Sequence, residues 1–163
     1  MNKDTSSLEF SHFPVMLSEI IQIASPEKGG LFIDCTFGGG SYSNALLKFP
    51  KTKVIGIDRD EAVISRANEL QKKYQKRFKF YQIKFSELDK ILNKNADTII
   101  FDLGLSSIQL KNLNRGFSFK SKNKLDMAMG LNNISAQEAI NNLSEKHLKL
   151  IIKVLGEETE ASN

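Results

Sequence analysis

The chain has 163 residues, of which 40% are hydrophobic and 26% are charged, and its formal net charge is +4. These values are typical of a soluble globular protein with one domain, or with one domain and part of a second. No apolar run approaches the roughly 20 residues that cross a bilayer, and residues 1–10 lack the apolar core of a signal peptide. We therefore expect a cytoplasmic protein with no membrane partner.

Three short apolar runs and one alternating segment, at 79–83, are typical of strands, and helical patterns separate them. The strands are expected at 31–36, 53–58, 79–83 and 98–103. The helices are expected at 14–24, 41–49, 61–74 and 86–92, the third capped by Asp60. This alternation predicts an α/β fold with a parallel sheet and helical crossovers.

The pattern changes after residue 104, because 105–130 shows little periodic hydrophobicity. Helices are expected again at 136–142 and 144–155. Ser135 and Glu138 form a predicted capping box for the first of these, and Ser144 is the predicted cap of the second. We predict a core at 1–104 and the start of a helical subdomain at 105–163, with a sheet that looks incomplete.

A glycine-rich turn, Asp34 to Gly40, follows the first predicted strand, and an acid, Asp58, ends the second. Strand, glycine turn, helix, strand and terminal acid are typical of a nucleoside-cofactor site. Glycines let the backbone approach a ligand closely, and a carboxylate accepts hydrogen bonds from ribose hydroxyls.

The third glycine of a dinucleotide-binding turn is missing. Counted from Gly38, that turn needs glycine at position 43, where this chain has Ser43. Acids also end strands one, two and four, as Asp34, Asp58 and Asp102, at the sheet edge where ligands bind. They suit a cationic ligand without phosphates, such as S-adenosylmethionine, better than a dinucleotide. The alternative is that each aspartate only caps the turn that follows it.

Cys35 is the single cysteine, so no intrachain disulfide is possible. It precedes a glycine turn, but neither His12 nor His147 is near it in sequence. We expect a small buried residue at the strand end rather than a nucleophile, and no metal role is predicted.

Basic residues cluster between positions 108 and 125, where no acidic residue occurs. They are Lys111, Arg115, Lys120, Lys122 and Lys124, with Phe117 and Phe119 among them. Such a surface binds phosphate backbones, and a solvated lysine-rich face is the equal alternative. We expect core packing rather than base stacking for the two phenylalanines. A second cluster between Lys72 and Lys79 is expected to be a solvated face.

Several longer segments carry a family resemblance that covers nearly the whole chain. They are HFPVML (12–17), DCTFGGG (34–40), GIDRD (56–60), FSEL (85–88), FDLGLSSIQL (101–110), RGFSF (115–119), LDMAM (125–129) and GEE (156–158). With them the chain resembles the MraW-type methyltransferases, the family of ribosomal RNA small subunit methyltransferase H.

The resemblance implies a Rossmann-like S-adenosylmethionine-dependent methyltransferase core with part of a helical substrate-recognition subdomain. The implied activity is N4-methylation of a cytidine in the decoding region of 16S rRNA, within the small ribosomal subunit. The implied cofactor contacts are Gly40, Ser41, Tyr42, Asp58, Phe85, Asp102 and Gln109. Asp102, with Ser106 and Ser107, is the candidate for orienting the reacting base. Arg115, Lys120, Lys122 and Lys124 are the candidate RNA contacts.

Three departures from the family pattern stand out. Ser41 and Tyr42 replace the Gly and His of many relatives, and Ile108 replaces a proline. If Gly40 or its neighbour needs a positive φ, the serine costs about 1 kcal/mol or more.

Family members also continue well beyond the GEE segment. The chain therefore resembles an N-terminal portion, whether a fragment, a frameshifted copy or a deliberate truncation, and its activity is expected to be reduced or absent. The alternatives are a module that binds S-adenosylmethionine or RNA without turnover and, from another class, an NAD-dependent oxidoreductase. The oligomeric state is left open.

Overall fold

The computed structural model describes residues 14–131 and 134–160 of the chain. The chain divides into two compact units, Met1–Ser107 and Ile108–Asn163, which we call the sheet unit and the helical unit. His12 and Phe13, which begin the first family-like segment, lie outside the described residues. No helix in the described part of the chain has the length and apolar character needed to span a bilayer.

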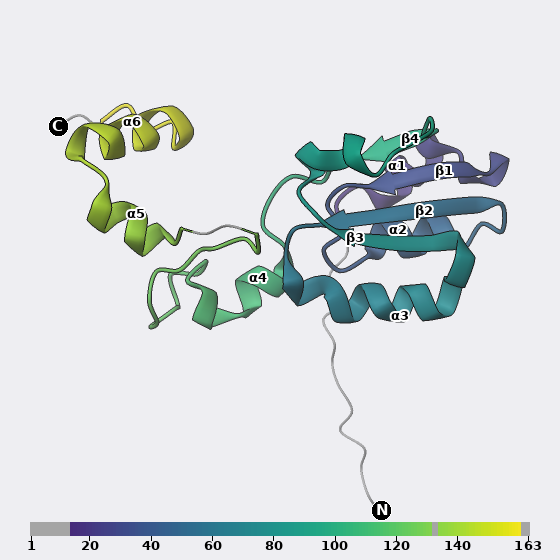
Figure 1. Cartoon of the computed structure of the whole chain (residues 1–163), viewed down its shortest axis with the longest axis horizontal. Coiled ribbons are helices and arrows are strands. Elements are labelled where there is room, and N and C mark those ends of the chain that lie inside the picture. Colours follow the sequence, from purple (N-terminus) through teal and green to yellow (C-terminus); the bar gives the residue numbers. More distant parts are fainter. Residues whose placement is uncertain (1–13, 132–133, 161–163) are drawn as a thin grey trace, which may run out of the picture. The chain divides into compact units, whose positions relative to one another are not determined.

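The sheet unit contains four parallel strands in the order β3-β2-β1-β4 (Figure 1). They are β1 (Gly30–Asp34), β2 (Thr52–Asp58), β3 (Phe78–Gln82) and β4 (Thr98–Ile100). All four lie where the sequence predicts strands. The reversal of strand order between β1 and β4 is typical of a Rossmann-like sheet, so the predicted fold class is confirmed.

Helices connect the parallel strands as crossovers. The sheet unit contains α1 (Leu17–Ala24), η1 (Pro26–Lys28), α2 (Ser41–Leu47), η2 (Glu61–Val63), α3 (Ile64–Tyr74), η3 (Gln75–Arg77) and η4 (Phe85–Lys90), where η marks a 3₁₀ helix. Helix α2 packs on β1 and β2, α3 packs on β3, and α1 contacts α2. Asp60 accepts a hydrogen bond from the Ala62 N–H, as its predicted capping role requires.

Both faces of the sheet contribute to the core. Phe32, Val54 and Phe78 stand in one row of the strand register and are almost completely buried. Alternate residues face the other side, where Ile33 and Ile57 pack with side chains from η4 and the segment after it. The period-2 alternation of a strand explains why one apolar run supplies both layers.

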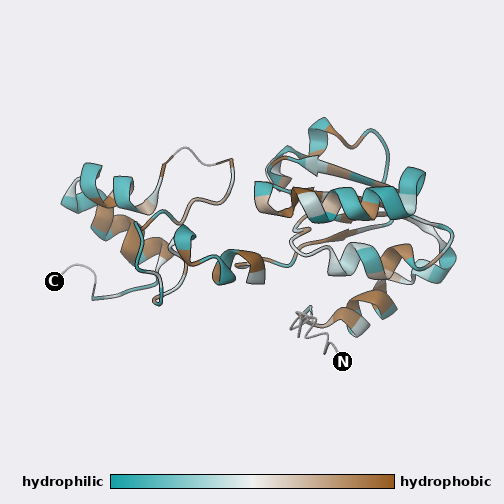
Figure 2. Cartoon of the chain, turned by 90° about the horizontal axis from the view of Figure 1, so that it is seen from below, coloured by the Kyte–Doolittle hydropathy of each residue, from teal (hydrophilic) through white to brown (hydrophobic). Residues whose placement is uncertain are grey.

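Several element boundaries differ from the prediction. Strand β4 ends at Ile100 rather than at residue 103, because the Asp102 N–H bonds to the Thr36 side chain instead of to the β1 backbone. Helix α1 begins at Leu17 rather than at residue 14, since Met16 has a left-handed conformation with φ 52°. The apolar residues of α1 appear brown in Figure 2.

The second basic cluster surrounds the end of α3. Its four lysines (Lys72, Lys73, Lys76 and Lys79) are exposed, as expected of a solvated face. Arg77 has a structural role, because its guanidinium donates to the carbonyls of Leu47 and Phe49 at 3.0 Å each and so caps the end of α2.

The helical unit contains α4 (Ser107–Lys111, which starts in the sheet unit), η5 (Leu113–Arg115), α5 (Ala136–Asn142) and α6 (Glu145–Leu155). The predicted capping box of Ser135 and Glu138 is present, and Ser144 caps α6. Helix α4 was not predicted, since five residues are too few to display a period of 3.6. No described residue of α5 or α6 is buried.

Candidate cofactor site

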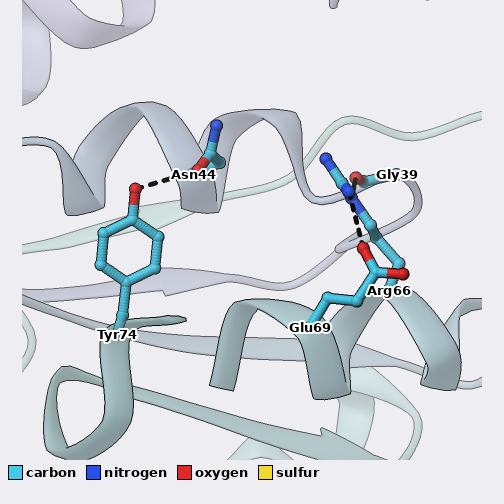
Figure 3. A network of polar contacts seen from close by, with 5 residues as sticks. All are labelled: Gly39, Asn44, Arg66, Glu69 and Tyr74. Carbon is cyan, nitrogen blue, oxygen red and sulfur yellow. Dashed lines mark hydrogen bonds and ion pairs between the residues drawn. The ribbon is translucent and has the colours of Figure 1, made fainter. Parts of the chain in front are cut away.

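The glycine turn between β1 and α2 is attached to the end of β2. The Phe37 N–H donates to the Ile57 carbonyl at 2.9 Å, and the Gly38 N–H donates to Asp58 Oδ2 at 2.8 Å. On α3, Arg66 donates from Nε to the Gly39 carbonyl at 3.3 Å, and Glu69 holds the same guanidinium at 2.8 Å (Figure 3). The turn backbone is therefore supported from two neighbouring elements. The role of Arg66 was not predicted, because no sequence motif marks it.

Gly40 must be glycine for two reasons. Its φ of 75° lies in the left-handed region, and a Cβ at this position would lie 2.6 Å from the Phe37 ring. A Cβ on Gly39, in contrast, would meet no atom within 4 Å. The turn thus presents open backbone at Gly39, which is what close approach of a ligand requires.

The strain considered for Ser41 does not occur. Ser41 is the first residue of α2 and lacks a positive φ, which falls on Gly40 instead. Serine is therefore compatible with the turn, and this departure from the family pattern carries no backbone penalty.

Asp58 holds the turn and still has free acceptor capacity. Its Oδ2 accepts from Gly38, and its Oδ1 accepts from the Asp60 N–H at 2.9 Å. Burial raises the pKa of Asp58, and these backbone hydrogen bonds oppose the increase. Each carboxylate oxygen has a second acceptor position, so hydrogen bonds from two ribose hydroxyls remain possible.

Asp34 is an internal residue rather than a surface acid. It is completely buried, and its Oδ2 accepts a 2.7 Å hydrogen bond from the Ser43 hydroxyl. Burial raises the pKa of Asp34 to about 6, and the Ser43 hydrogen bond is the largest opposing influence. Of the three strand-end acids, only Asp58 and Asp102 are therefore accessible to a ligand. Ser43 occupies the position of the missing third glycine, and its hydroxyl donates a hydrogen bond to Asp34.

Asp102 lies just beyond β4, and its side chain is exposed. Its backbone N–H donates to Thr36 Oγ1 at 2.8 Å, and its Oδ2 lies 3.3 Å from the hydroxyl of Tyr42. Tyr42 is buried on α2 and also donates to the Val15 carbonyl. Burial raises the pKa of Tyr42 to about 12, with Asp102 as the next cause, so the hydroxyl is neutral at physiological pH.

Three further predicted site residues belong to the sheet unit, namely Phe85, Ser106 and Ser107. Phe85 begins η4, is half exposed, and packs edge-on against Phe101 with ring centroids 5.5 Å apart. Ser106 lies beside the turn, because a Cβ on Gly38 would be 3.8 Å from the Ser106 Cβ. Ser107 begins α4.

Cys35 is a buried strand-end residue, as predicted. Burial raises the pKa of its thiol to about 11, and the nearby Asp34 adds to the increase, so the thiolate nucleophile is disfavoured. In the described ranges, no group of three or more His, Cys, Asp or Glu side chains is arranged to hold a metal ion.

The remaining predicted site residues belong to the helical unit. Gln109 is buried on α4, and Lys120, Lys122 and Lys124 are exposed. Arg115 is partly buried, where it donates to the Ala128 carbonyl and stacks over the Phe117 ring.

The prediction that Phe119 packs in the core is wrong, because its side chain is fully exposed. The Ser121 N–H donates to the Ser118 carbonyl, and this turn places Phe119 at its tip, away from any cover.

The parallel sheet, the glycine turn and the acid that ends β2 define a protein of the nucleoside-cofactor-binding α/β class. Comparison with known proteins gives the family. The model of the MraW methylase family matches residues 9–163, and the chain therefore belongs to the MraW methylase family.

Its relatives include proteins named ribosomal RNA small subunit methyltransferase H. Identity is 43% with the protein of Rickettsia massiliae, over 91% of this chain and 49% of that protein. It is 42% with the protein of Orientia tsutsugamushi, over 93% of this chain and 49% of that protein. The chain thus spans about half the length of the curated relatives it matches.

A crystal structure from Clostridium thermocellum, of a protein described as a candidate rRNA methylase, is also similar. It has a TM-score of 0.46 and 19% identity over 52% of this chain and 50% of that one. A likeness at this level adds nothing to the family assignment.

Proposed function

We propose that this chain is the S-adenosylmethionine-binding portion of a methyltransferase that modifies the N4 amine of a cytidine in the decoding region of 16S rRNA. The observation that carries the proposal is the open glycine turn held by Asp58, beside Asp102, in a chain of the MraW methylase family. The names of the relatives support a ribosomal RNA substrate in the small subunit. A cytoplasmic location follows from that substrate.

The residues present fit the proposed cofactor. Open backbone at Gly39 admits a ligand, and the spare acceptor positions of Asp58 suit ribose hydroxyls. The half-exposed Phe85 ring offers a face for adenine, and the Asp102 carboxylate suits a cationic methionine portion. Gly40, Ser41 and Gln109 are the other proposed direct contacts, whereas the hydroxyl of Tyr42 is directed at Asp102 and the Val15 carbonyl.

When bound, S-adenosylmethionine supplies an electrophilic sulfonium methyl group. The protein's task is to position the cytidine amine, which is a weak nucleophile because its lone pair is delocalised into the ring. We assign Asp102 to orienting that amine and to stabilising the positive charge that develops on it. Ser106 and Ser107 are proposed to hold the base by hydrogen bonds, and alignment supplies much of the rate enhancement.

The proposed RNA contacts are on the helical unit. Lys120, Lys122 and Lys124 are exposed and suit phosphates, whereas Arg115 is already engaged with Ala128 and Phe117. The exposed ring of Phe119 is available for stacking on an unpaired base. We therefore assign the three lysines and Phe119 to direct contact and Arg115 to a largely structural part.

Calorimetry with S-adenosylmethionine and NAD, followed by methyl transfer to small ribosomal subunits, tests the proposal. We expect binding of S-adenosylmethionine by the native chain and loss of at least tenfold in affinity in Asp58→Ala. Binding of NAD alone would overturn the methyltransferase proposal in favour of an oxidoreductase. Family membership and the Ser43–Asp34 hydrogen bond disfavour that outcome.

The second candidate is a fragment that binds S-adenosylmethionine or RNA without turnover. Tight cofactor binding without methyl transfer would select this candidate.

A further inference from the structure

We propose that Thr36 and Tyr42 are positioning residues that hold Asp102 in place for the cofactor and the substrate amine. The inference rests on the proposed function and adds a supporting role that the resemblance assigns to neither side chain. Both side chains come from the segment that carries the glycine turn, whereas Asp102 comes from the end of β4, 60 or more residues later.

The Thr36 side chain forms a hydrogen bond at the position where the next backbone hydrogen bond between β1 and β4 would lie. The last backbone hydrogen bond between the two strand ends runs from the Cys35 N–H to the Ile100 carbonyl, at 2.9 Å. Beyond it the Asp102 N–H donates to Thr36 Oγ1 at 2.8 Å. The Thr36 side chain therefore extends the hydrogen bonding between β1 and β4 and fixes the Asp102 backbone beyond the end of β4.

Tyr42 acts on the carboxylate itself. Its hydroxyl lies 3.3 Å from Asp102 Oδ2 and also donates to the Val15 carbonyl, so two acceptors share one proton. Tyr42 is only 4% exposed, which leaves the hydroxyl little freedom to turn elsewhere. Asp102 Oδ1 accepts no hydrogen bond from the residues that the structure describes, and it remains available to a ligand.

The functional consequence is preorganisation. An exposed aspartate without anchors samples several rotamers, and fixing them on binding costs affinity. Two anchors on one residue, at the backbone N–H and at Oδ2, reduce that cost before the ligand arrives. Since the anchors act only through Asp102, their removal should matter only while the carboxylate is present.

Equilibrium dialysis with labelled S-adenosylmethionine on the 163-residue chain tests this dependence. Thr36→Val and Tyr42→Phe should each weaken binding about three- to tenfold, the range expected for one lost hydrogen bond. Thr36→Ser keeps the acceptor and should restore affinity. In an Asp102→Ala background the same two substitutions should change affinity by less than about twofold.

Matched controls separate positioning from general stability. Tyr74→Phe removes a hydroxyl that donates to Asn44 Oδ1 at 3.0 Å, on the same helix α2 (Figure 3). Thr52→Val removes a buried hydroxyl that donates to the Leu46 and Phe49 carbonyls. Both should lower the free energy of unfolding without changing the affinity of the folded protein, and circular dichroism verifies folding of every variant.

Two outcomes would overturn the inference. Equal losses with and without the Asp102 carboxylate would give Thr36 and Tyr42 a purely structural role, and unchanged affinity in both single variants would give them no role in binding. If Thr36→Val does not fold, Tyr42→Phe with and without the Asp102 carboxylate still tests whether Asp102 is positioned by its neighbours. Absence of cofactor binding by the native chain is a different result, which overturns the proposed function and this role with it.

Discussion

Different kinds of interaction stabilise the sheet unit and the helical unit. In the sheet unit, side chains from β1, β2, β3, α2 and α3 are almost completely buried, among them Phe32, Leu46 and Ala67. In the described part of the helical unit no apolar side chain is buried to that degree, and Ile151 and Leu155 on α6 are exposed. The helices there are defined instead by local caps such as Ser135 and Ser144. Burial thus stabilises one unit, whereas capping and helix propensity define the other.

The largest expected effect is the loss of a core side chain from the sheet unit. Phe32→Ala should lower the free energy of unfolding by about 3–5 kcal/mol, because the ring is fully buried in the central strand. Urea denaturation followed by circular dichroism measures the loss. Leu155→Ala, in the helical unit, is the matched control and should change stability by less than about 0.5 kcal/mol. Similar losses in both variants would contradict the contrast between the units.

A second effect of almost this size depends on pH and comes from Asp34. Its pKa rises from 3.8 to about 6 on folding, so the folded state keeps its proton while the unfolded state loses it. The contribution of Asp34 to the free energy of unfolding should therefore be highest below about pH 4 and fall by about 3 kcal/mol as the pH rises past 6. Asp34→Asn removes this contribution.

Urea denaturation at several pH values gives the difference in the free energy of unfolding between Asp34→Asn and the native chain. The difference should shift in favour of the variant between about pH 4 and pH 6. Ser43→Ala should extend the decline to higher pH, since the Ser43 hydroxyl lowers the pKa of Asp34. Asp58, whose pKa is also raised, contributes with the same sign and leaves a residual slope in the variant. Parallel stability curves would show that Asp34 does not titrate in this range.

The glycine turn gives a third test, in which two neighbouring glycines should behave differently. Gly40→Ala should cost about 2 kcal/mol, from the left-handed φ and the contact with Phe37, and should also abolish cofactor binding. Gly39→Ala meets no atom and has no positive φ, so its stability should be unchanged. Thermal denaturation and calorimetry measure the two properties, and equal costs would contradict the assigned turn geometry.

The smallest expected effect is on a cap in the helical unit. Ser135→Ala removes one half of the capping box and should destabilise α5 by about 1 kcal/mol. Amide hydrogen exchange should show faster exchange in Ala136–Asn142 and unchanged exchange in β1 and β2. Faster exchange in the strands as well would show that the units do not unfold independently.

Much of the sheet unit could be predicted from sequence, because β1 and β2 are short, largely buried apolar runs between turn residues and β3 has an alternating pattern. The four strands, the Asp60 cap and the buried Cys35 are all found as predicted. The caps Ser135 and Ser144 were equally readable, since capping depends on residues within one helical turn. Helix α4 and the exposure of Phe119 could not be predicted, because each depends on a short segment without periodicity.

In the candidate site, too, some features could be predicted from local sequence and others depend on tertiary contacts. Sequence alone determined the family resemblance, the glycine turn and its partner acid Asp58, because these are recorded in residue types at fixed spacing. Only the tertiary structure decided that Asp34 is internal, that Ser41 is unstrained, and that Thr36 and Tyr42 meet Asp102. Contacts between residues 60 or more positions apart are set by strand order and register, which no local pattern in the sequence encodes.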